Sequence, residues 1–211
     1  AGCVASVETS GISLHELGPA PRFSAAVKAG TLKVLDATCP AVYAALQAGA
    51  KGQPFAPLRG LIGSDLVRHR PDWRVIDNPF ADGGDPIVLL PALNADIAMF
   101  HASRADAEGN VWIGRDRDRL LAAHAANTVL VTVDEQVSGS FFDDEATAAG
   151  ALPAHYVSAM SLVPGGCRPM RPDGSVDLDA VRRYQRAAQT DAGFDAWLDV
   201  EVFGHVAATS A

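Results

Sequence analysis

Arg59 is the side chain whose type and setting point most directly to chemistry. It lies in the segment Pro57-Leu58-Arg59-Gly60-Leu61-Ile62-Gly63, where proline and glycine constrain the loop. A guanidinium on such a loop binds a carboxylate through two parallel hydrogen bonds with little further loss of entropy. Gly60 and Gly63 would let a ligand approach the backbone closely. The segment predicts a site for a substrate carboxylate, and the alternative is a solvated arginine or an ion pair with a nearby acid.

Ser64 and Asp65 follow this loop and precede a short predicted helix that runs to Arg70. Serine and aspartate are preferred helix N-caps, so capping is the simpler interpretation of the pair. A helix N-terminus also binds anions. The pair is therefore a second candidate for orienting a carboxylate or a developing oxyanion.

A group of four polar residues, His101, Arg104, Asp106 and Asn110, lies within ten positions of the chain. The group follows an apolar run and includes Gly109-Asn110, a turn signal because both residues tolerate positive φ. The pattern predicts a polar network at a strand-to-turn junction. We expect this network to brace a site or a partner interface rather than to touch substrate.

Other candidates for chemistry are weaker. Glu8 and Asp36 each end a predicted strand where an acid or base could face a cleft. Cys39 precedes a proline at a helix start, which can activate a thiol, but we expect it to be buried. The histidines lack the H-x-H and H-E-x-x-H spacings, so no metal site is expected. Neither G-x-G-x-x-G nor a P-loop occurs, so no nucleotide fingerprint is present.

The elements that must position these residues follow a βαβ pattern at the start of the chain. Further on, consecutive apolar runs imply a sheet of mixed direction. The Pro- and Gly-rich segment 53–63 is predicted to be a loop, as is segment 164–174. Strands are predicted at 3–7, 32–35, 73–76, 87–93, 97–102, 111–113, 128–133 and 156–163, and helices at 20–29, 40–50, 117–126, 178–189 and 194–203.

Composition bounds the classes of function. The chain has 211 residues, 48% of them apolar, which is enough for one sizeable core, or for two compact lobes, without disulfides or metal. Its formal charge of −8 argues against a nucleic-acid surface. An odd number of widely spaced cysteines suits a reducing compartment, so we expect a cytoplasmic protein. No apolar run approaches the roughly 20 residues that span a bilayer, and no signal peptide is recognisable.

Three segments also carry a resemblance to a known family, and they occur in that family's order. They are R-x-x-x-G-S-D at 59–65, H-A-x-R-A-D-x-x-G-N-V at 101–111 and V-x-V-D-E-Q-V at 131–137. At these residues the chain resembles the A (α-type) subunit of the family I coenzyme A transferases, of which the α-type subunit of glutaconate CoA-transferase is the best-known type. The resemblance continues into the Pro164-Gly165-Gly166 turn and covers nearly the whole chain.

The resemblance implies a mechanism shared between two subunits. In this family a glutamate of the B (β-type) subunit, within a Glu-Asn-Gly motif, attacks the acyl-CoA thioester. This chain has no Glu-Asn-Gly, so no catalytic residue is expected in it beyond the weak candidates Asp36 and Glu8. The Gly-Gly-Phe motif that usually opens the α-type subunit is also missing, so we expect the first βα unit to be absent.

We therefore expect a single α/β domain over residues 1–211, with the open three-layer mixed sheet that the family uses. The resemblance implies the α-type subunit of a CoA transferase, with coenzyme A as substrate, no permanently bound cofactor and a β-type partner. Substrate binding is assigned to Arg59, Gly60, Gly63, Ser64 and Asp65.

Two alternatives to the transferase stay open. The first is a subunit of a CoA-thioester (ring-opening) hydrolase, although the related steroid ring-opening enzyme carries a catalytic glutamate where this chain has Ala37. The second is a non-catalytic binding subunit that keeps the fold and the interface.

Overall fold

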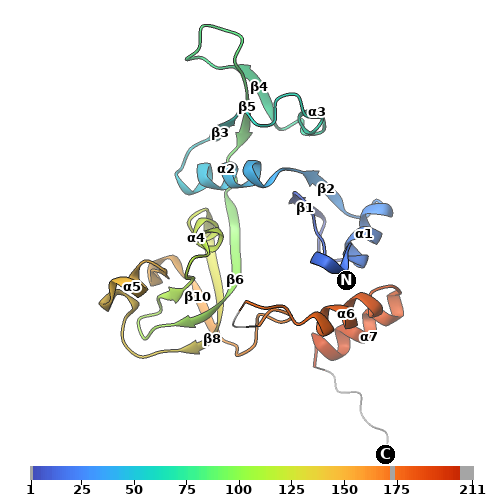
Figure 1. The fold of residues 1–211 in the computed structure, drawn as a ribbon, viewed down its shortest axis with the longest axis vertical. Helices are drawn as coiled ribbons and strands as arrows, with labels where there is room; N and C mark the ends of the chain where they lie inside the picture. The colour runs from blue at the N-terminus through green and yellow to red at the C-terminus, as the bar shows by residue number, and fades with distance from the viewer. Residues whose placement is uncertain (1, 172–173, 205–211) are drawn as a thin grey trace, which may run out of the picture. The chain divides into compact units, whose positions relative to one another are not determined.

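The computed structural model describes residues 2–171 and 174–204, so two positions of the predicted loop 164–174 lie outside the described residues. The chain forms two compact units, which are Ala1–Asp36 with Pro169–Ala211 and, between them in sequence, Ala37–Arg168. Figure 1 shows the elements in chain order from blue to red. A compact unit is a group of residues in mutual contact and need not fold independently. That residues 1–211 form a single domain therefore remains a prediction.

Among its described residues, the first unit contains a pair of parallel strands, three α-helices and one short 3-10 helix. Its helix α1 has a proline in its first turn and is followed by Gly30 at φ 68°, so the predicted glycine stop is confirmed. Arg22 binds Asp191 at 2.6 Å and stacks on Phe194, which ties α1 to α7. The elements of this unit are β1 (Ser6–Thr9), η1 (His15–Leu17), α1 (Pro21–Lys28), β2 (Lys33–Asp36), α6 (Leu178–Ala187) and α7 (Asp191–Glu201).

The second unit contains a five-stranded sheet in the order β10-β8-β6-β7-β9. Strands β10, β8 and β6 run parallel, whereas β7 pairs antiparallel with both β6 and β9, so the predicted mixed direction is confirmed. Along β8, Val129, Val131 and Val133 are buried and alternate with half-buried residues, which places one face of the sheet on the core. Its elements are β6 (Ala95–Ala105), β7 (Val111–Trp112), α4 (Arg117–His124), β8 (Ala126–Gln136), η2 (Phe141–Asp143), α5 (Glu145–Ala148), β9 (Ala151–Leu152), η3 (Ala154–Tyr156) and β10 (Ala159–Leu162).

A second, three-stranded antiparallel sheet of this unit has the order β3-β5-β4. Ala41 and Ala45 of α2 pack with Trp73, Val88 and Leu90 in one buried cluster that covers one face of this sheet. Its elements are α2 (Cys39–Ala50), β3 (Phe55–Leu58), α3 (Leu66–His69), β4 (Arg74–Asp77) and β5 (Pro86–Pro91).

Strand β3 corrects the prediction that 53–63 is a loop throughout. The prolines that suggested a loop are tolerated because β3 is an edge strand, where a missing N–H breaks no ladder on the open side. Ala56 is buried between exposed neighbours, as in a half-buried strand.

The mixed α/β class with open sheets is confirmed, and within the described residues the strands pair in three sheets. Across the described part of the chain, no helix has the length and apolar character that a bilayer crossing requires.

Candidate functional site

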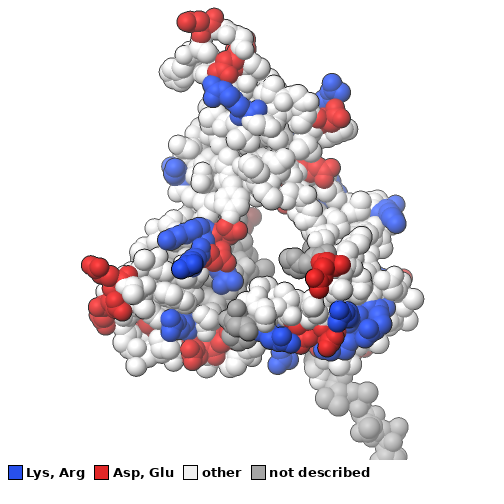
Figure 2. All heavy atoms as spheres, viewed as in Figure 1, with Lys and Arg blue, Asp and Glu red and all other residues white. Residues whose placement is uncertain are grey.

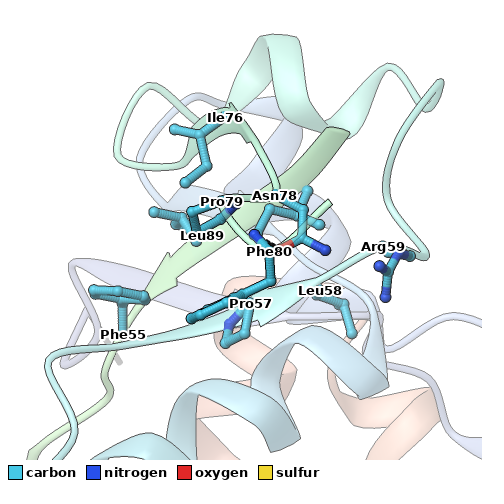
Figure 3. A pocket seen from close by; sticks show the side chains of 10 residues that line it. Phe55, Pro57, Leu58, Arg59, Ile76, Asn78, Pro79, Phe80 and Leu89 are labelled. Atoms are coloured by element: carbon cyan, nitrogen blue, oxygen red, sulfur yellow. Dashed lines mark hydrogen bonds between the residues drawn. The ribbon is translucent and has the colours of Figure 1, made fainter. Parts of the chain in front are cut away.

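The three-stranded sheet has an apolar hollow on the side turned away from α2. Phe55 and Pro57 of β3, Leu89 of β5 and Ile76 of β4 line it, because strand register places them on one face. The hollow has a volume of about 310 Å³, and Phe80 from the loop after β4 completes it. Figure 3 shows Arg59 at its margin.

Arg59 is bound to a carboxylate of the chain itself. Its Nε and Nη2 atoms donate to the two oxygens of Asp85 at 2.8 and 2.5 Å, and the Asn78 amide donates to the same carboxylate at 2.7 Å. The Arg59 guanidinium, helped by Asn78, lowers the pKa of Asp85 to about 2. Of the alternatives for Arg59, the structure contains the ion pair, and binding of a substrate carboxylate stays a prediction.

The residues after Arg59 do not form the predicted helix cap. Ser64 Oγ donates to the carbonyl of Leu61 at 2.8 Å, and Asp65 accepts from Arg68 at 3.2 Å. Asp65 holds the N-cap position of α3, but its φ of −68° and ψ of −19° are helical, whereas a capping residue is extended. The capping prediction is therefore wrong. Gly60 and Gly63 face open space, which is compatible with a ligand without requiring one.

A second group of polar side chains lies in the carboxyl-terminal halves of three parallel strands. Cα register aligns His101 of β6, Thr132 of β8 and Ser161 of β10 in one row. This row borders a shallow hollow of about 500 Å³ that also reaches the turn after β10. The carboxyl ends of parallel strands are where α/β proteins form ligand sites.

His101 has a hydrogen bond at one ring nitrogen and a carboxylate neighbour at the other. Nδ1 lies 2.9 Å from Thr132 Oγ1, and Nε2 lies 3.2 Å from Asp134 Oδ2, with side chains 10% and 15% exposed. Neither Nε2 nor Oδ2 has a hydrogen bond to a described residue, so the contact has the distance of an ion pair without hydrogen-bond alignment. The two contacts restrict the orientation of the imidazole ring.

Asp134 links this row to the turn after β10. Its Oδ1 accepts from the backbone N–H of Gly165 at 2.7 Å. Burial opposes ionisation, but the Gly165 N–H and the adjacent His101 outweigh it and lower the pKa of Asp134. A Cβ at Gly166 would lie 3.1 Å from His101 Nδ1, so glycine allows the turn to approach the ring. We call His101, Thr132, Asp134 and the 164–167 turn the strand-end cluster.

Asp106 forms the centre of a separate buried network. Its carboxylate accepts from the backbone N–H groups of Glu108, Asn110 and Phe141 and from the Asn110 amide, at 2.8 to 3.0 Å. Burial opposes ionisation, yet these four donors lower the pKa of Asp106. Asn110 Oδ1 in turn accepts from Ala154 at 2.8 Å. The network fastens the turn between β6 and β7 to two later segments.

Arg104 stacks over Trp112 and Phe141, with its guanidinium carbon 5.0 and 5.6 Å from the ring centres. Arg104, Asp106 and Asn110 thus brace a turn, while His101 belongs to the strand-end cluster. That these residues brace a substrate site or a partner interface remains a prediction.

Glu8 and Asp36 lie on neighbouring strands of the first unit. Glu8 is opposite Leu35 and Asp36 opposite Thr9, so the two carboxylates project to opposite faces of the two-stranded sheet. A two-carboxylate acid–base arrangement between them is therefore excluded in this sheet. Cys39 is exposed rather than buried, which corrects that expectation, because it is the first residue of α2.

The sequence analysis did not select Thr132 and Asp134, which the structure places beside His101. Asp134 could have been selected, because it is an acid that follows the apolar run of β8, and the same pattern selected Glu8 and Asp36. Among the described residues no group of three or more His, Cys, Asp or Glu side chains is arranged to hold a metal ion.

Comparison with known proteins identifies similar sequences and folds. A family model described as coenzyme A transferase matches residues 1–157. The A subunit of 3-oxoadipate CoA-transferase from Pseudomonas knackmussii is 35% identical over 168 residues, which cover 74% of this chain and 55% of that protein. The A subunit of glutaconate CoA-transferase from Acidaminococcus fermentans is 31% identical over 201 residues, which cover 86% and 62%. The chain thus spans less than two thirds of either relative.

A solved structure agrees with these sequence matches. The crystal structure of glutaconate coenzyme A-transferase from Acidaminococcus fermentans superposes with a TM-score of 0.84 at 25% identity, over 95% of this chain and 69% of that one. A cholesterol ring-cleaving hydrolase IpdA subunit of Rhodococcus jostii is 34% identical over 94 residues, which cover 43% of this chain and 32% of that protein.

Proposed function

This chain belongs to the coenzyme A transferase family, and from this premise we propose that it is the α-type subunit of an enzyme that moves CoA between an acyl-CoA and a carboxylic acid. The observation that carries the proposal is the family match over residues 1–157, together with relatives that are named as A subunits of CoA-transferases. A β-type subunit would supply the attacking glutamate, because this chain lacks Glu-Asn-Gly. Coenzyme A is the proposed substrate, and the cytoplasm is the proposed location.

The strand-end cluster is the proposed contribution of this chain to the acyl pocket. It offers a hollow with apolar walls from Met99, Leu130 and Ala159, and polar atoms from Thr132 and His101. Such a mixture can hold an acyl group by burial and orient its polar end. His101, fixed between Thr132 and Asp134, would keep its direction while substrate enters.

The Arg59 loop is the proposed second contact with substrate. Arg59 is 66% exposed while it holds Asp85, so a substrate carboxylate would have to replace Asp85 on the guanidinium. Such an exchange keeps the bidentate geometry and changes only the acceptor. Gly60, Gly63, Ser64 and Asp65 would border the incoming group.

The test is to incubate the purified two-subunit complex with an acyl-CoA and to map any covalently modified glutamate by mass spectrometry. We expect the adduct on the β-type subunit and no turnover by this chain alone. A covalent acyl or CoA adduct on this chain in isolation contradicts the proposal.

Products of the same incubation separate the alternatives. CoA on an acceptor acid supports transfer, free CoA or a ring-opened acid indicates a hydrolase, and no turnover with the β-type partner indicates a binding subunit.

A further inference from the structure

His101, Thr132 and Ser161 form one row across three parallel strands, on the face of the sheet opposite the buried valines of β8. Met99 and Leu130 pair with each other two residues earlier along β6 and β8, on the same face. The hollow that these residues line therefore passes from apolar to polar along the strands. Such a gradient fits an acyl chain with an apolar part and one polar group.

The carboxylate beside His101 decides what this row can offer to a ligand. Asp134 Oδ2 lies 3.2 Å from His101 Nε2, and the lowered pKa of Asp134 keeps the carboxylate ionised at neutral pH. A negative oxygen at this distance favours an N–H at Nε2 over a lone pair. In a neutral imidazole Nδ1 is then the acceptor, so the Thr132 hydroxyl donates to it at 2.9 Å. Thr132 has only acceptor lone pairs left for a ligand.

Ser161 can supply the complementary donor. It is exposed, so its hydroxyl can turn to donate or to accept. Neighbouring strands lie about 4.8 Å apart, and a hydroxyl oxygen bonded to two others lies about 2.8 Å from each. One ligand hydroxyl can therefore donate to Thr132 and accept from Ser161. A carboxylate has no hydrogen for Thr132 and would set its lone pairs against another acceptor.

Charge also argues against a carboxylate at this row. None of the residues that line the hollow is lysine or arginine, and Asp134 lies two residues from Thr132 on the same face. Arg168 lies beside Gly165 of the turn, but it is exposed and does not line the hollow. Figure 2 shows Lys and Arg atoms in separate groups among acidic ones on the face in view, without a broad positive area. A carboxylate here would lack a cation, whereas a hydroxyl needs none.

We propose that Thr132 and Ser161 select an acyl group that carries a hydroxyl on an apolar chain, and that they disfavour one that places a second carboxylate at this row. That the ligand is an acyl group rests on the proposed function, whereas the hydrogen-bond roles rest on the contacts of His101. The carboxylate that Arg59 would bind is then the one that exchanges CoA. His101 and Asp134 are positioning residues, because they act on the ligand through the Thr132 hydroxyl.

The experiment measures kcat/KM of the complex with the β-type subunit for acyl-CoAs of equal chain length. The probes are 3-hydroxybutyryl-CoA, 4-hydroxybutyryl-CoA, butyryl-CoA and succinyl-CoA. We expect the better hydroxybutyryl-CoA to exceed both of the others by at least about tenfold. The assay is run at about pH 8.5, because the argument applies to a neutral imidazole.

Thr132→Val keeps the shape of the side chain and removes its hydroxyl. Thr128→Val is the matched control, because Thr128 is half-buried on the same face of β8 but does not line the hollow. We expect Thr132→Val to lower the ratio of kcat/KM for hydroxybutyryl-CoA to that for butyryl-CoA by at least about fivefold, and Thr128→Val by less than about twofold. Equal ratios in the two variants contradict the role of Thr132.

Asp134→Asn tests the direction of the proton. The amide removes the charge and can donate to Nε2, which would make Nδ1 the donor and turn the Thr132 hydrogen toward the hollow. We expect the preference for hydroxybutyryl-CoA over succinyl-CoA to fall by at least about fivefold. A structural role of Asp134 alone would lower kcat/KM for all the probes alike, and that result overturns the proton assignment.

The outcomes separate this inference from the proposed function. If the complex transfers CoA but uses butyryl-CoA or succinyl-CoA as well as the hydroxybutyryl-CoAs, the selection is overturned while the subunit function stands. Turnover of other acyl-CoAs without either hydroxybutyryl-CoA overturns it in the same way. If the complex turns over no acyl-CoA, the proposed function and the selection both fail.

Discussion

Asp106 and Asp85 are carboxylates whose pKa values are both lowered. The turn around Asp106 and the sheet edge around Asp85 nevertheless differ in burial and in the charge of the groups that donate to the carboxylate. Asp106 is 0% exposed and is held by four neutral donors. Asp85 has 28% of its side chain exposed and is held chiefly by Arg59, which is 66% exposed. Removing the Asp106 carboxylate would leave several buried N–H donors with neither an acceptor nor water. If the pair of Arg59 and Asp85 is broken, water can hydrate both side chains. The direction of a pKa shift therefore does not measure what a carboxylate contributes to stability.

The largest expected effect is that of Asp106→Ala. The substitution leaves buried N–H groups without acceptors, and we expect it to lower the free energy of unfolding by about 3–5 kcal/mol. Urea titration measures the change. Asp195→Ala, at an exposed position of α7, is the control and should lie within about 0.5 kcal/mol of wild type. A loss below about 1 kcal/mol for Asp106→Ala would remove the contrast with Asp85.

A smaller effect is expected for Gly166→Ala, which extends the comparison to the strand-end cluster. The new Cβ would lie 2.9 Å from the Val163 carbonyl oxygen and 3.1 Å from His101 Nδ1, so the turn or the ring must move. We expect a loss of about 1–3 kcal/mol of unfolding free energy. Gly60→Ala is the matched control, because a Cβ there meets nothing within 4 Å. Equal midpoints for the two variants would contradict the close approach.

The free energy of unfolding should depend on pH differently in wild type and in Asp106→Asn. The folded-state pKa of Asp106 is below that of an unfolded carboxyl. Its charge therefore stabilises the fold fully above the unfolded pKa of about 3.9, and this stabilisation is lost as the pH falls through the folded pKa. We expect the difference in unfolding free energy between wild type and Asp106→Asn to be largest near neutral pH and to shrink in acid. A difference that grows in acid would reverse the sign.

The smallest effect on stability is expected for Arg59→Ala. The pKa of Asp85 should rise from about 2 toward its ordinary value, while the urea midpoint changes little and the change disappears in high salt. In the assembled enzyme we expect a raised KM for the acyl substrate. Arg59→Lys, which keeps the charge but loses the two-pronged geometry, should restore KM only in part. Unchanged kinetics in both variants would remove Arg59 from the site.

The sequence predicted elements better than it predicted contacts. Strands β6 and β8 were predicted because each contains a continuous run of apolar residues, and such a run is visible in the local sequence. The same reasoning missed β3, because the prolines that argued for a loop are harmless on the open side of an edge strand, and strand order is not local. Cys39 was expected inside because of its type, but its position at the start of α2 exposes it.

The candidate site shows the same division. Arg59 was recognised as a carboxylate ligand by type, but its partner Asp85 lies 26 residues away and was not identified. His101 was recognised within its motif, but Thr132 and Asp134 reach it only through the parallel pairing of β6 with β8. The four donors to Asp106 include Phe141, which lies 35 residues further along the chain.

The amino-acid sequence alone determined the family segments, the alternation of strands and helices and the excess of acidic charge, because each depends on residue type and near neighbours. The tertiary structure decided which carboxylate each basic side chain holds, which face of the three-stranded sheet stays open and that Phe80 lies outside the core. Those outcomes depend on strand register and packing, which join residues that are far apart in the chain.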